Sequence, residues 1–434
     1  MELVGTYLFI PFAVMLVIGV PVGISLGLAC AVFIFFSGWG RPPMLLVTEM
    51  YVGVALFALL ALPMFVLTGE LLNRCEITDK LVRFAQLLVG WIRGGLAHVN
   101  IVTSMFFAGI SGSVLADAAS LGPILIPAMI RERFPADFSA AVTASSAVIG
   151  AIIPPSTVAI IIGSQLEISI GGLFAGGIIP GVLVGLALMI TSWFISWRND
   201  YGEVHKFAGP VAIVKSSGSA FPALLIPVII LGGILAGVFT PTEAGAVAVF
   251  YTLIIGTFYY RTLDWPKLRA SMIATAKVTA SALFIVAVAL VFSRILTFFR
   301  IPEEILNLLL SISTNKIVIA LIIIGFFLVM GTFMDAVANM IILGPLLMPV
   351  AVSPLGLGMD PIQYGLFLAV GLLLGLITPP LGLLLFICGP IARVSLERTA
   401  LAVLPFLAAE LVVLLLIVFV KPVTMAIPNA LGLG

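Results

Sequence analysis

The sequence predicts an all-α polytopic membrane protein that consists of two inverted repeats. Of its 434 residues, 62% are hydrophobic and only 9% are charged, and the mean hydropathy is +1.31. Soluble domains carry roughly 25% charged residues, so this chain could not cover a soluble surface. The apolar residues form long uninterrupted runs, and two segments in the middle of such runs resemble each other. Together these observations predict membrane-spanning helices in two related halves.

The same composition excludes several other classes of protein. A soluble enzyme, a disordered chain and a disulfide-stapled module all need a different balance of residues. The net charge of +1 gives no reason to expect nucleic-acid binding. Cys30, Cys75 and Cys388 are too widely spaced to indicate a disulfide framework or a metal site. No phosphate-binding loop or hydrolase motif is found, so neither ATP-driven transport nor an enzyme is predicted.

The apolar stretches predict about ten transmembrane helices. A helix needs roughly 20 residues to cross the hydrocarbon core. Stretches 4–36 and 221–258 are longer than one crossing, and each is interrupted, at Gly19–Gly23 and at Thr240–Glu243, so each is expected to form two helices. The stretches lie at about 4–36, 52–72, 97–130, 138–163, 172–196, 221–258, 270–298, 317–356, 363–390 and 400–420.

Two of these stretches predict re-entrant helical hairpins instead of crossings. Residues 97–130 are interrupted by the polar segment Ser111–Ser113, and residues 317–356 by Gly331–Asp335. Each arm is too short to span the bilayer. Non-helical backbone at membrane depth is tolerated only where it is buried in protein or lines a cavity. The two interruptions are therefore expected to be hairpin tips inside the protein.

The distribution of basic residues fixes the predicted orientation. With the N-terminus outside and both hairpins re-entrant, fourteen Lys and Arg residues fall on one face and four on the other. Cytoplasmic loops carry such an excess. The predicted domains are a first repeat at 1–200, a cytoplasmic linker at 201–220 and a second repeat at 221–434.

An internal alignment supports the two repeats. At a shift of 222 positions, Gly109 matches Gly331 and Asp117 matches Asn339. At a shift of 225, the pair Pro154–Pro155 matches Pro379–Pro380. Each half then has five crossings, an odd number, so the halves are inverted relative to each other. Inverted repeats with interrupted helices in matching positions indicate a secondary transporter.

The interruptions carry the candidate binding groups. Paired prolines should unwind a helix and free carbonyl oxygens, and such oxygens, with hydroxyls and a carboxylate, suit a small cation such as sodium. The helices that follow present N–H groups to an anionic substrate. The candidate ion- and substrate-binding residues are Gly109, Ser111, Gly112, Ser113, Asp117, Pro154, Pro155, Ser156, Thr157, Gly331, Thr332, Asp335, Asn339, Thr378, Pro379 and Pro380.

Structural alternatives exist for each kind of candidate. A proline pair can be a simple kink, and a Ser or Thr hydroxyl can bond back to its own helix. Asp117 and Asp335 could instead form structural ion pairs with Lys277 or Arg294. An intramembrane carboxylate is nevertheless a functional candidate by default.

The motifs as a set resemble the large permease subunit of TRAP (tripartite ATP-independent periplasmic) transporters. They are Gly-Ile-Ser-Gly-Ser-Val-Leu-Ala-Asp (109–117), Ile-Ile-Pro-Pro-Ser (152–156), Gly-Val-Phe-Thr-Pro-Thr-Glu-Ala (237–244), Gly-Thr-Phe-Met-Asp (331–335) and Ile-Thr-Pro-Pro (377–380). The resemblance covers essentially the whole chain.

This resemblance implies a sodium-coupled importer of organic acids in the bacterial inner membrane. A transport domain, made of the hairpins and unwound helices, would slide against a scaffold domain as an elevator. It implies no cofactor beyond the coupling sodium ions, and two protein partners: a periplasmic binding protein and a small four-helix membrane subunit, here expected as a separate chain. The implied sodium sites lie near Ser111, Ser113 and Pro154 and near Gly331, Asp335 and Thr378.

Two other functions stay open at the level of sequence. A stand-alone sodium–dicarboxylate symporter would need no binding protein. A channel or structural membrane subunit would use the polar interruptions to line a pore. The substrate is also open among C4-dicarboxylates, sialic acid, sugar acids and keto acids, because pocket shape depends on three-dimensional packing.

Overall fold

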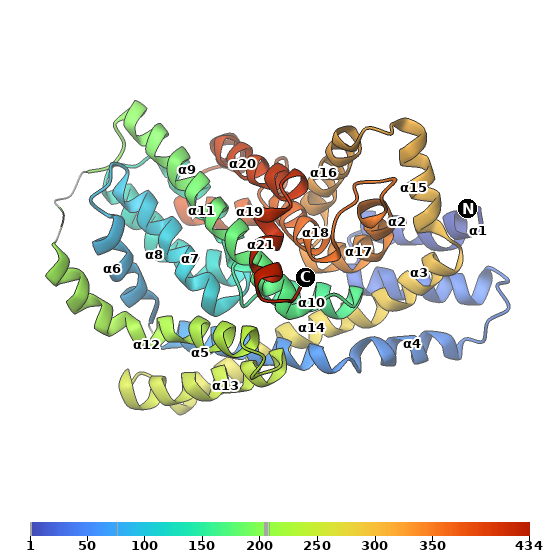
Figure 1. Cartoon of the computed structure of the whole chain (residues 1–434), viewed down its shortest axis with the longest axis horizontal. Helices are drawn as coiled ribbons and strands as arrows, with labels where there is room; N and C mark the ends of the chain where they lie inside the picture. The colour runs from blue at the N-terminus through green and yellow to red at the C-terminus, as the bar shows by residue number, and fades with distance from the viewer. Residues whose placement is uncertain (1, 76, 204–206, 208) are drawn as a thin grey trace.

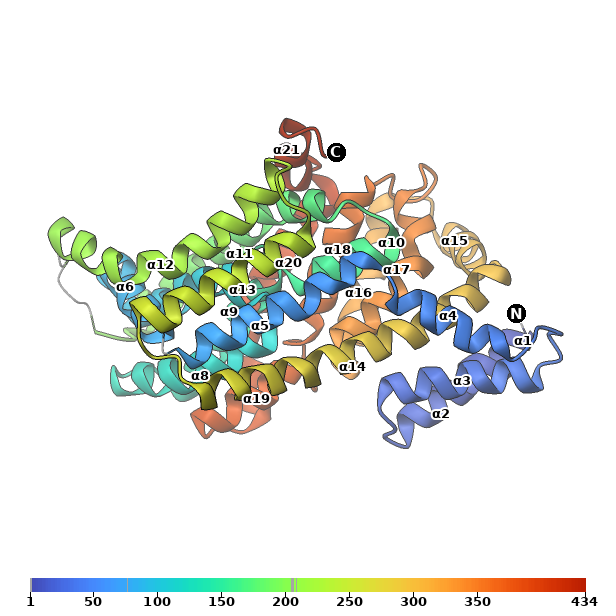
Figure 2. The same ribbon diagram turned by 90° about the horizontal axis from the view of Figure 1, so that it is seen from below.

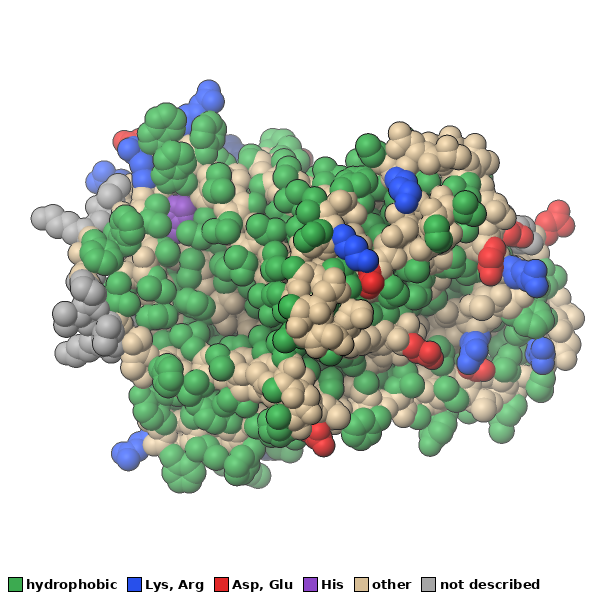
Figure 3. Space-filling model, in the orientation of Figure 1, with side chains coloured by type: hydrophobic (Ala, Val, Ile, Leu, Met, Phe, Trp, Pro, Cys, Tyr) green, Lys and Arg blue, Asp and Glu red, His purple; other side chains and the backbone are tan. Residues whose placement is uncertain are grey.

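The protein is helical throughout the part of the chain that the structure describes. The computed structural model describes residues 2–75, 77–203, 207 and 209–434, and every regular element in them is a helix. Eight of these helices are long and apolar enough to cross a membrane by length and composition. Hydrophobic side chains cover much of the visible face (Figure 3). The predicted all-α class is confirmed, and the chain has the helices of a multi-pass membrane protein.

In the first half, the helices begin and end close to the predicted interruptions. The chain turns between α2 and α3, where stretch 4–36 was expected to divide, and Gly19 there has a φ of +88°. The helices are α1 (Glu2–Val4), η1 (Gly5–Phe9), α2 (Ile10–Val17), α3 (Val22–Phe36), α4 (Met44–Val54), η2 (Phe57–Leu60), α5 (Ala61–Arg74), α6 (Ile77–Val89), α7 (Gly95–Ser111), α8 (Val114–Arg131), α9 (Ala136–Val148), η3 (Ile149–Ala151), α10 (Thr157–Leu166) and α11 (Ile170–Asn199).

In the second half, too, helices begin and end close to the predicted interruptions. Stretch 221–258 divides before Pro241, where Thr240 and Glu243 form a capping box at the start of α13. The helices are α12 (Pro210–Leu235), α13 (Pro241–Ile254), η4 (Ile255–Tyr259), α14 (Trp265–Phe298), α15 (Ile301–Ile312), α16 (Lys316–Phe333), α17 (Ala336–Val352), α18 (Pro361–Gly375), α19 (Leu383–Ala392), α20 (Leu396–Phe419) and α21 (Pro422–Ala430).

Some elements differ from the sequence prediction. Helix α12 begins at Pro210, inside the segment 201–220 predicted as a linker, part of which lies outside the described residues. Helices α6 and α15 were not predicted at all. Both are amphipathic: in α6, Ile77, Leu81 and Ala85 are buried at a spacing of four residues. A search for continuous apolar runs misses helices of this kind.

Four helices form one side of the molecule, which we call the long-helix layer: α4, α5, α13 and α14. In Figure 2, α4 and α5 run nearly end to end in front of other helices, with α13 and α14 on either side of α5. Helix α5 packs on α13 and α14, and α14 also packs on α3, α4 and α17. In Figure 1 the predicted hairpins and interrupted helices lie above this layer, and α7 and α17 pack against α5 and α14.

The interrupted helices of the two halves interlock. Helix α10, which follows the first proline pair, packs on α17 and α18 of the second half. Helix α19, which follows the second pair, packs on α8 and α9 of the first half. Each half therefore supplies a short helix that packs against the other half. The two repeats and their inverted relation stay predictions.

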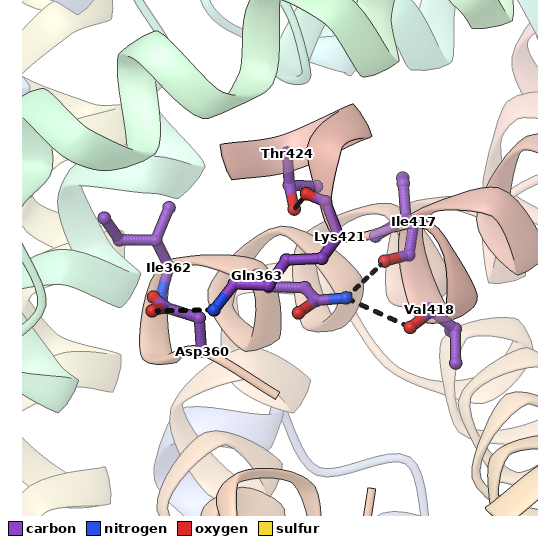
Figure 4. Close-up of polar contacts among 7 residues, drawn as sticks. All are labelled: Asp360, Ile362, Gln363, Ile417, Val418, Lys421 and Thr424. Carbon is purple, nitrogen blue, oxygen red and sulfur yellow. Dashed lines mark hydrogen bonds and ion pairs between the residues drawn. The ribbon is translucent and has the colours of Figure 1, made fainter. Parts of the chain in front are cut away.

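Side-chain hydrogen bonds join the start of α18 to the end of α20 (Figure 4). The buried Gln363 Nε2 donates hydrogen bonds to the carbonyl oxygens of Ile417 at 2.8 Å and Val418 at 3.0 Å. The last carbonyls of a helix lack partners within it, so this amide satisfies groups that burial would otherwise leave unpaired. Asp360 caps α18 and lies 3.9 Å from Lys421 Nζ.

Candidate functional site

A cavity of about 610 Å³ lies where the long-helix layer meets the predicted hairpin tips. Helices α5 and α14 form one wall. The starts of α8, α10 and α17, with the end of α7, form the opposite wall. Its polar lining consists of Glu70, Asn73, Ser111, Ser113, Ser120, Thr157, Lys277, Ser281 and Asp335.

Three helix N-termini meet at this cavity. Ser113 caps α8 by accepting the Ala116 N–H at 3.4 Å, and Asp335 caps α17 by accepting the Val337 N–H at 2.9 Å. Helix α10 begins at Thr157, which also lines the cavity. The first N–H groups of a helix have no partner within it and form the positive end of its dipole. The wall is therefore suited to an anionic group.

The first tip is hydrogen-bonded to Thr157, which follows the first proline pair. The Gly112 carbonyl oxygen accepts hydrogen bonds from Thr157 Oγ1 at 2.8 Å and from Thr157 N at 3.3 Å. Gly112 has a φ of +60°, and a Cβ at this position would lie 2.6 Å from the Pro155 carbonyl oxygen. Only glycine fits this close approach. Both proline pairs, Pro154–Pro155 and Pro379–Pro380, are joined by cis peptide bonds.

Asp117 lies buried behind the first tip. One of its carboxylate oxygens accepts a hydrogen bond from Ser111 Oγ. The other oxygen, Oδ2, has no hydrogen-bond partner among the described residues. It lies against Gly150, where any Cβ would overlap with it. A buried carboxylate with an open oxygen, beside a hydroxyl and the short helix η3, is the kind of oxygen site that a small cation prefers.

The ion pairs considered for the two aspartates are not found. Arg294 Nε lies 3.3 Å from Glu49 Oε2. Lys277 has no ion pair within the described part of the chain, although it lines the same cavity as Asp335. The structural alternative for Asp117 and Asp335 is therefore not supported.

The second tip is built differently. Asn339 Nδ2 donates to the carbonyl oxygens of Met330 at 2.9 Å and Met334 at 3.3 Å, across the interruption between α16 and α17. Asn339 Oδ1 is buried without a partner among the described residues. Gly331 packs directly on Gly375 of α18: a Cβ at Gly331 would lie 2.7 Å from the Gly375 Cα.

Two predicted hydroxyls of the second half bond within their own helices. Thr332 Oγ1 donates to the Leu328 carbonyl at 2.7 Å, and Thr378 Oγ1 donates to the Leu374 carbonyl at 2.8 Å. Neither lines the cavity. This is the back-bonded arrangement that the structural alternative describes.

Of the sixteen predicted residues, the cavity brings four together: Ser111, Ser113, Thr157 and Asp335. The remaining first-half residues support the tip from behind: Gly109, Gly112, Asp117, Pro154, Pro155 and Ser156. Gly331, Thr332, Asn339, Thr378, Pro379 and Pro380 of the second half lie outside its lining.

Sequence reasoning missed the wall that the long-helix layer supplies. Glu70 and Asn73 come from α5, and Lys277 and Ser281 from α14. Neither helix is interrupted where it lines the cavity, so no break in the helix marks these positions, although Gly69 of α5 is also part of the lining. The available signal was the charge of Glu70 and Lys277 within apolar helices, which is costly there without a role.

A second depression, of about 710 Å³, lies at the ends of α10 and α17 beside α15. Gln165 and Glu167 supply its polar part, and Leu306 and Met348 are among its apolar residues. It contains none of the predicted site residues.

Comparison with known proteins identifies the family. The family model described as "Tripartite ATP-independent periplasmic transporter, DctM component" matches residues 9–423. The chain is 38% identical over 417 residues to the large permease protein of the sialic acid TRAP transporter of Vibrio cholerae, and covers 96% of each. It is 33% identical over 444 residues to the C4-dicarboxylate large permease protein of the same organism, covering 98% of this chain and 97% of the relative.

A third relative is longer than this chain. The isethionate TRAP transporter permease protein of Oleidesulfovibrio alaskensis is 38% identical over 419 residues. The match covers 96% of this chain but 65% of that protein.

Solved structures agree in fold. The YdaH transporter of Alcanivorax borkumensis matches with a TM-score of 0.61 at 15% identity, over 87% of this chain and 88% of that one. MtrF of Neisseria gonorrhoeae matches with a TM-score of 0.59 at 14% identity, over 94% of each chain. With the family model spanning almost the whole sequence, the chain belongs to the large permease components, the DctM components, of the tripartite ATP-independent periplasmic transporters.

Proposed function

We propose that this permease imports a small organic acid together with sodium ions across the bacterial inner membrane. A periplasmic binding protein delivers the acid, and a small four-helix membrane subunit accompanies the permease. The observation that carries the proposal is the cavity at which three helix N-termini meet, with the open carboxylate oxygen of Asp117 directly behind it.

The relatives support the chemical class of the substrate. Their names specify sialic acid, C4-dicarboxylate, isethionate and, in Escherichia coli, 2,3-diketo-L-gulonate. All are small acids. An acidic group bound at the starts of α8, α10 and α17 accepts hydrogen bonds from N–H groups that the helices themselves leave free.

Sodium is assigned to the backs of the two tips. In the first half, Asp117 Oδ2, Ser111 and the carbonyls freed at Pro154 supply oxygen atoms. In the second half, Asn339 Oδ1 and the carbonyls beside Gly331 and Thr378 supply them. A cation in the first position neutralises the buried carboxylate, whose desolvation is otherwise costly. It thereby orders the tip at which the acid binds.

Transport follows as an elevator movement. The interrupted helices of both halves carry the acid and sodium, and slide along the long-helix layer. The cavity lies on the boundary between these groups, where such a movement would open and close it. The N-terminus is assigned to the periplasm, as the distribution of basic residues predicts.

The test is uptake into proteoliposomes that contain the permease and its small subunit, with the binding protein added outside. We expect uptake to require an inward sodium gradient and to stop when potassium replaces sodium. Asp117→Asn should lower the apparent affinity for sodium about tenfold or more. Asp79→Asn removes an exposed carboxylate on α6 and is the matched control. Sodium-independent uptake, or equal sodium affinity in both variants, would contradict the proposal.

A further inference from the structure

We propose that Lys277 makes the cavity selective for acids that carry one negative charge. The inference rests on the proposed function and deepens it. It assigns substrate recognition to the long-helix layer as well as to the tips. The class selected is a singly charged hydroxy, keto or sulfonic acid, and C4-dicarboxylates are rejected.

Lys277 is placed to meet a substrate in the cavity. It lies on α14, in the wall opposite the starts of α8, α10 and α17. Its side chain is exposed to the cavity, and within the described residues it has no ion pair. Arg294, on the same helix, lies 3.3 Å from the Glu49 carboxylate. Lys277 is thus a cation in an apolar helix, and its ammonium group is available to bind an anionic substrate.

The other charged groups of the cavity already have partners. Glu70 lies 3.4 Å from Arg74, one turn further along α5. The Asp335 carboxylate accepts the Val337 N–H at the start of α17. Of the described residues that line the cavity, Lys277 alone is positive, while Glu70 and Asp335 are negative.

This arrangement favours one anionic group over two. A carboxylate or sulfonate that lies between Lys277 and the helix N-termini of the opposite wall uses both positive features of the cavity. A second anionic group would then find no further positive side chain among the described lining residues, and its charge would add to those of Glu70 and Asp335, which is unfavourable in a partly desolvated site. Specificity of this kind comes from repulsion of the wrong ligand as much as from attraction of the right one.

The rest of the lining suits a neutral polar body. Ser111, Ser113, Ser120, Thr157 and Ser281 offer hydroxyl groups. These can exchange hydrogen bonds with substrate hydroxyl or keto groups. Apolar side chains, among them Phe107 and Ile161, fill the spaces between them.

The contact should also depend on the transport state. Lys277 belongs to the long-helix layer, whereas the helix N-termini belong to the interrupted helices. A substrate that travels with the tips leaves Lys277 behind. Loss of Lys277 should therefore weaken apparent substrate affinity, seen in KM, more than it lowers the maximal rate.

The test measures ligand-induced thermal stabilisation of the purified permease in sodium. The probes are singly charged acids (sialic acid, isethionate, gluconate and pyruvate) and doubly charged succinate and fumarate. We expect at least one singly charged acid to bind about tenfold or more tightly than either dicarboxylate. Lys277→Gln should weaken that binding about tenfold or more, and Lys277→Arg should retain it. Arg269→Gln removes a positive charge from the same helix outside the cavity lining and should change nothing.

The outcomes separate this inference from the proposed function. Stabilisation by sodium alone should be the same in Lys277→Gln as in the unmodified protein, which shows that the variant is folded. Equal acid binding in both, or a preference for dicarboxylates, overturns the role of Lys277 but leaves acid transport standing. If no acid of either class stabilises the unmodified protein in sodium, both the proposed function and this inference fail.

Discussion

The contact between the first tip and the first proline pair makes a sharp prediction for Gly112→Ala. The substitution places an alanine at a φ of +60°, which costs about 1–2 kcal/mol. Its Cβ would also lie 2.6 Å from the Pro155 carbonyl oxygen, so the tip must move away. That movement breaks the hydrogen bonds from Thr157 to the Gly112 carbonyl, worth about 0.5–1.5 kcal/mol each. The docked tip should lose about 2–5 kcal/mol in all.

The loss should appear in sodium binding. If sodium orders the docked tip, a cost of about 2–5 kcal/mol weakens apparent sodium affinity by about 30-fold to about 5,000-fold. The assay is sodium-dependent thermal stabilisation of the purified permease, paired with uptake in proteoliposomes. The control is Gly232→Ala in α12, where no atom lies within 4 Å of the added Cβ and helix propensity favours alanine.

Removal of the Thr157 hydroxyl provides a second check on its contact with Gly112. Thr157→Val deletes the hydroxyl that bonds to Gly112, whereas Thr157→Ser keeps it. Combined with Gly112→Ala, the valine substitution should add little, because both act on one contact. Sodium affinity in Gly112→Ala equal to that of Gly232→Ala would refute the reasoning.

Three further predictions follow from other contacts. Gln363→Leu should lower stability by about 1–3 kcal/mol, measured by thermal unfolding, because two carbonyls at the end of α20 lose their donor. Gly331→Ala should cost about 1–3 kcal/mol through overpacking against Gly375, whereas Gly325→Ala on the same helix, with open space around it, should not; equal midpoints would contradict this. Asn339→Leu should reduce sodium-dependent uptake more than protein yield, since its amide spans the second interruption.

The sequence predicted the interruptions well because their cause is local. Proline cannot continue a helix, and glycine or polar residues within an apolar run mark where the backbone leaves it. Helix α7 ends at Ser111, α16 ends at Phe333, and α9 and α18 end before their proline pairs. Each of these ends lies within a few residues of a predicted interruption.

The rest depends on packing that no local pattern encodes. The helices α6 and α15 are amphipathic, so they are recognisable by a periodic apolar face and not by a continuous apolar run. The stretch predicted at 52–72 belongs to a longer, interrupted segment that starts with α4 at Met44. The Lys277 wall of the cavity comes from a helix with no interruption there. Its role appears only when α14 is placed opposite the tips.

The two tips differ because the aligned sequences differ at the contact itself. At a shift of 222, Gly112 corresponds to Met334, and at a shift of 225, Thr157 corresponds to Gly382. The second half therefore lacks both the glycine that allows close approach and the hydroxyl that bonds to it. Pro155 is accordingly buried, while Pro380 is exposed.

The gates that the two repeats would form are thus chemically unlike. Asp335 stands at the position of Ser113, so the second tip is capped by a carboxylate where the first is capped by a hydroxyl. Alternating access in an inverted-repeat transporter requires the halves to exchange conformations, but it does not require them to hold those conformations by the same bonds. In this permease, hydrogen bonds from the Thr157 hydroxyl and backbone N–H to the Gly112 carbonyl hold the first tip on its broken helix. The second tip has no such bond among the described contacts, so we expect its closure to depend more than that of the first tip on a ligand bound beside Asp335.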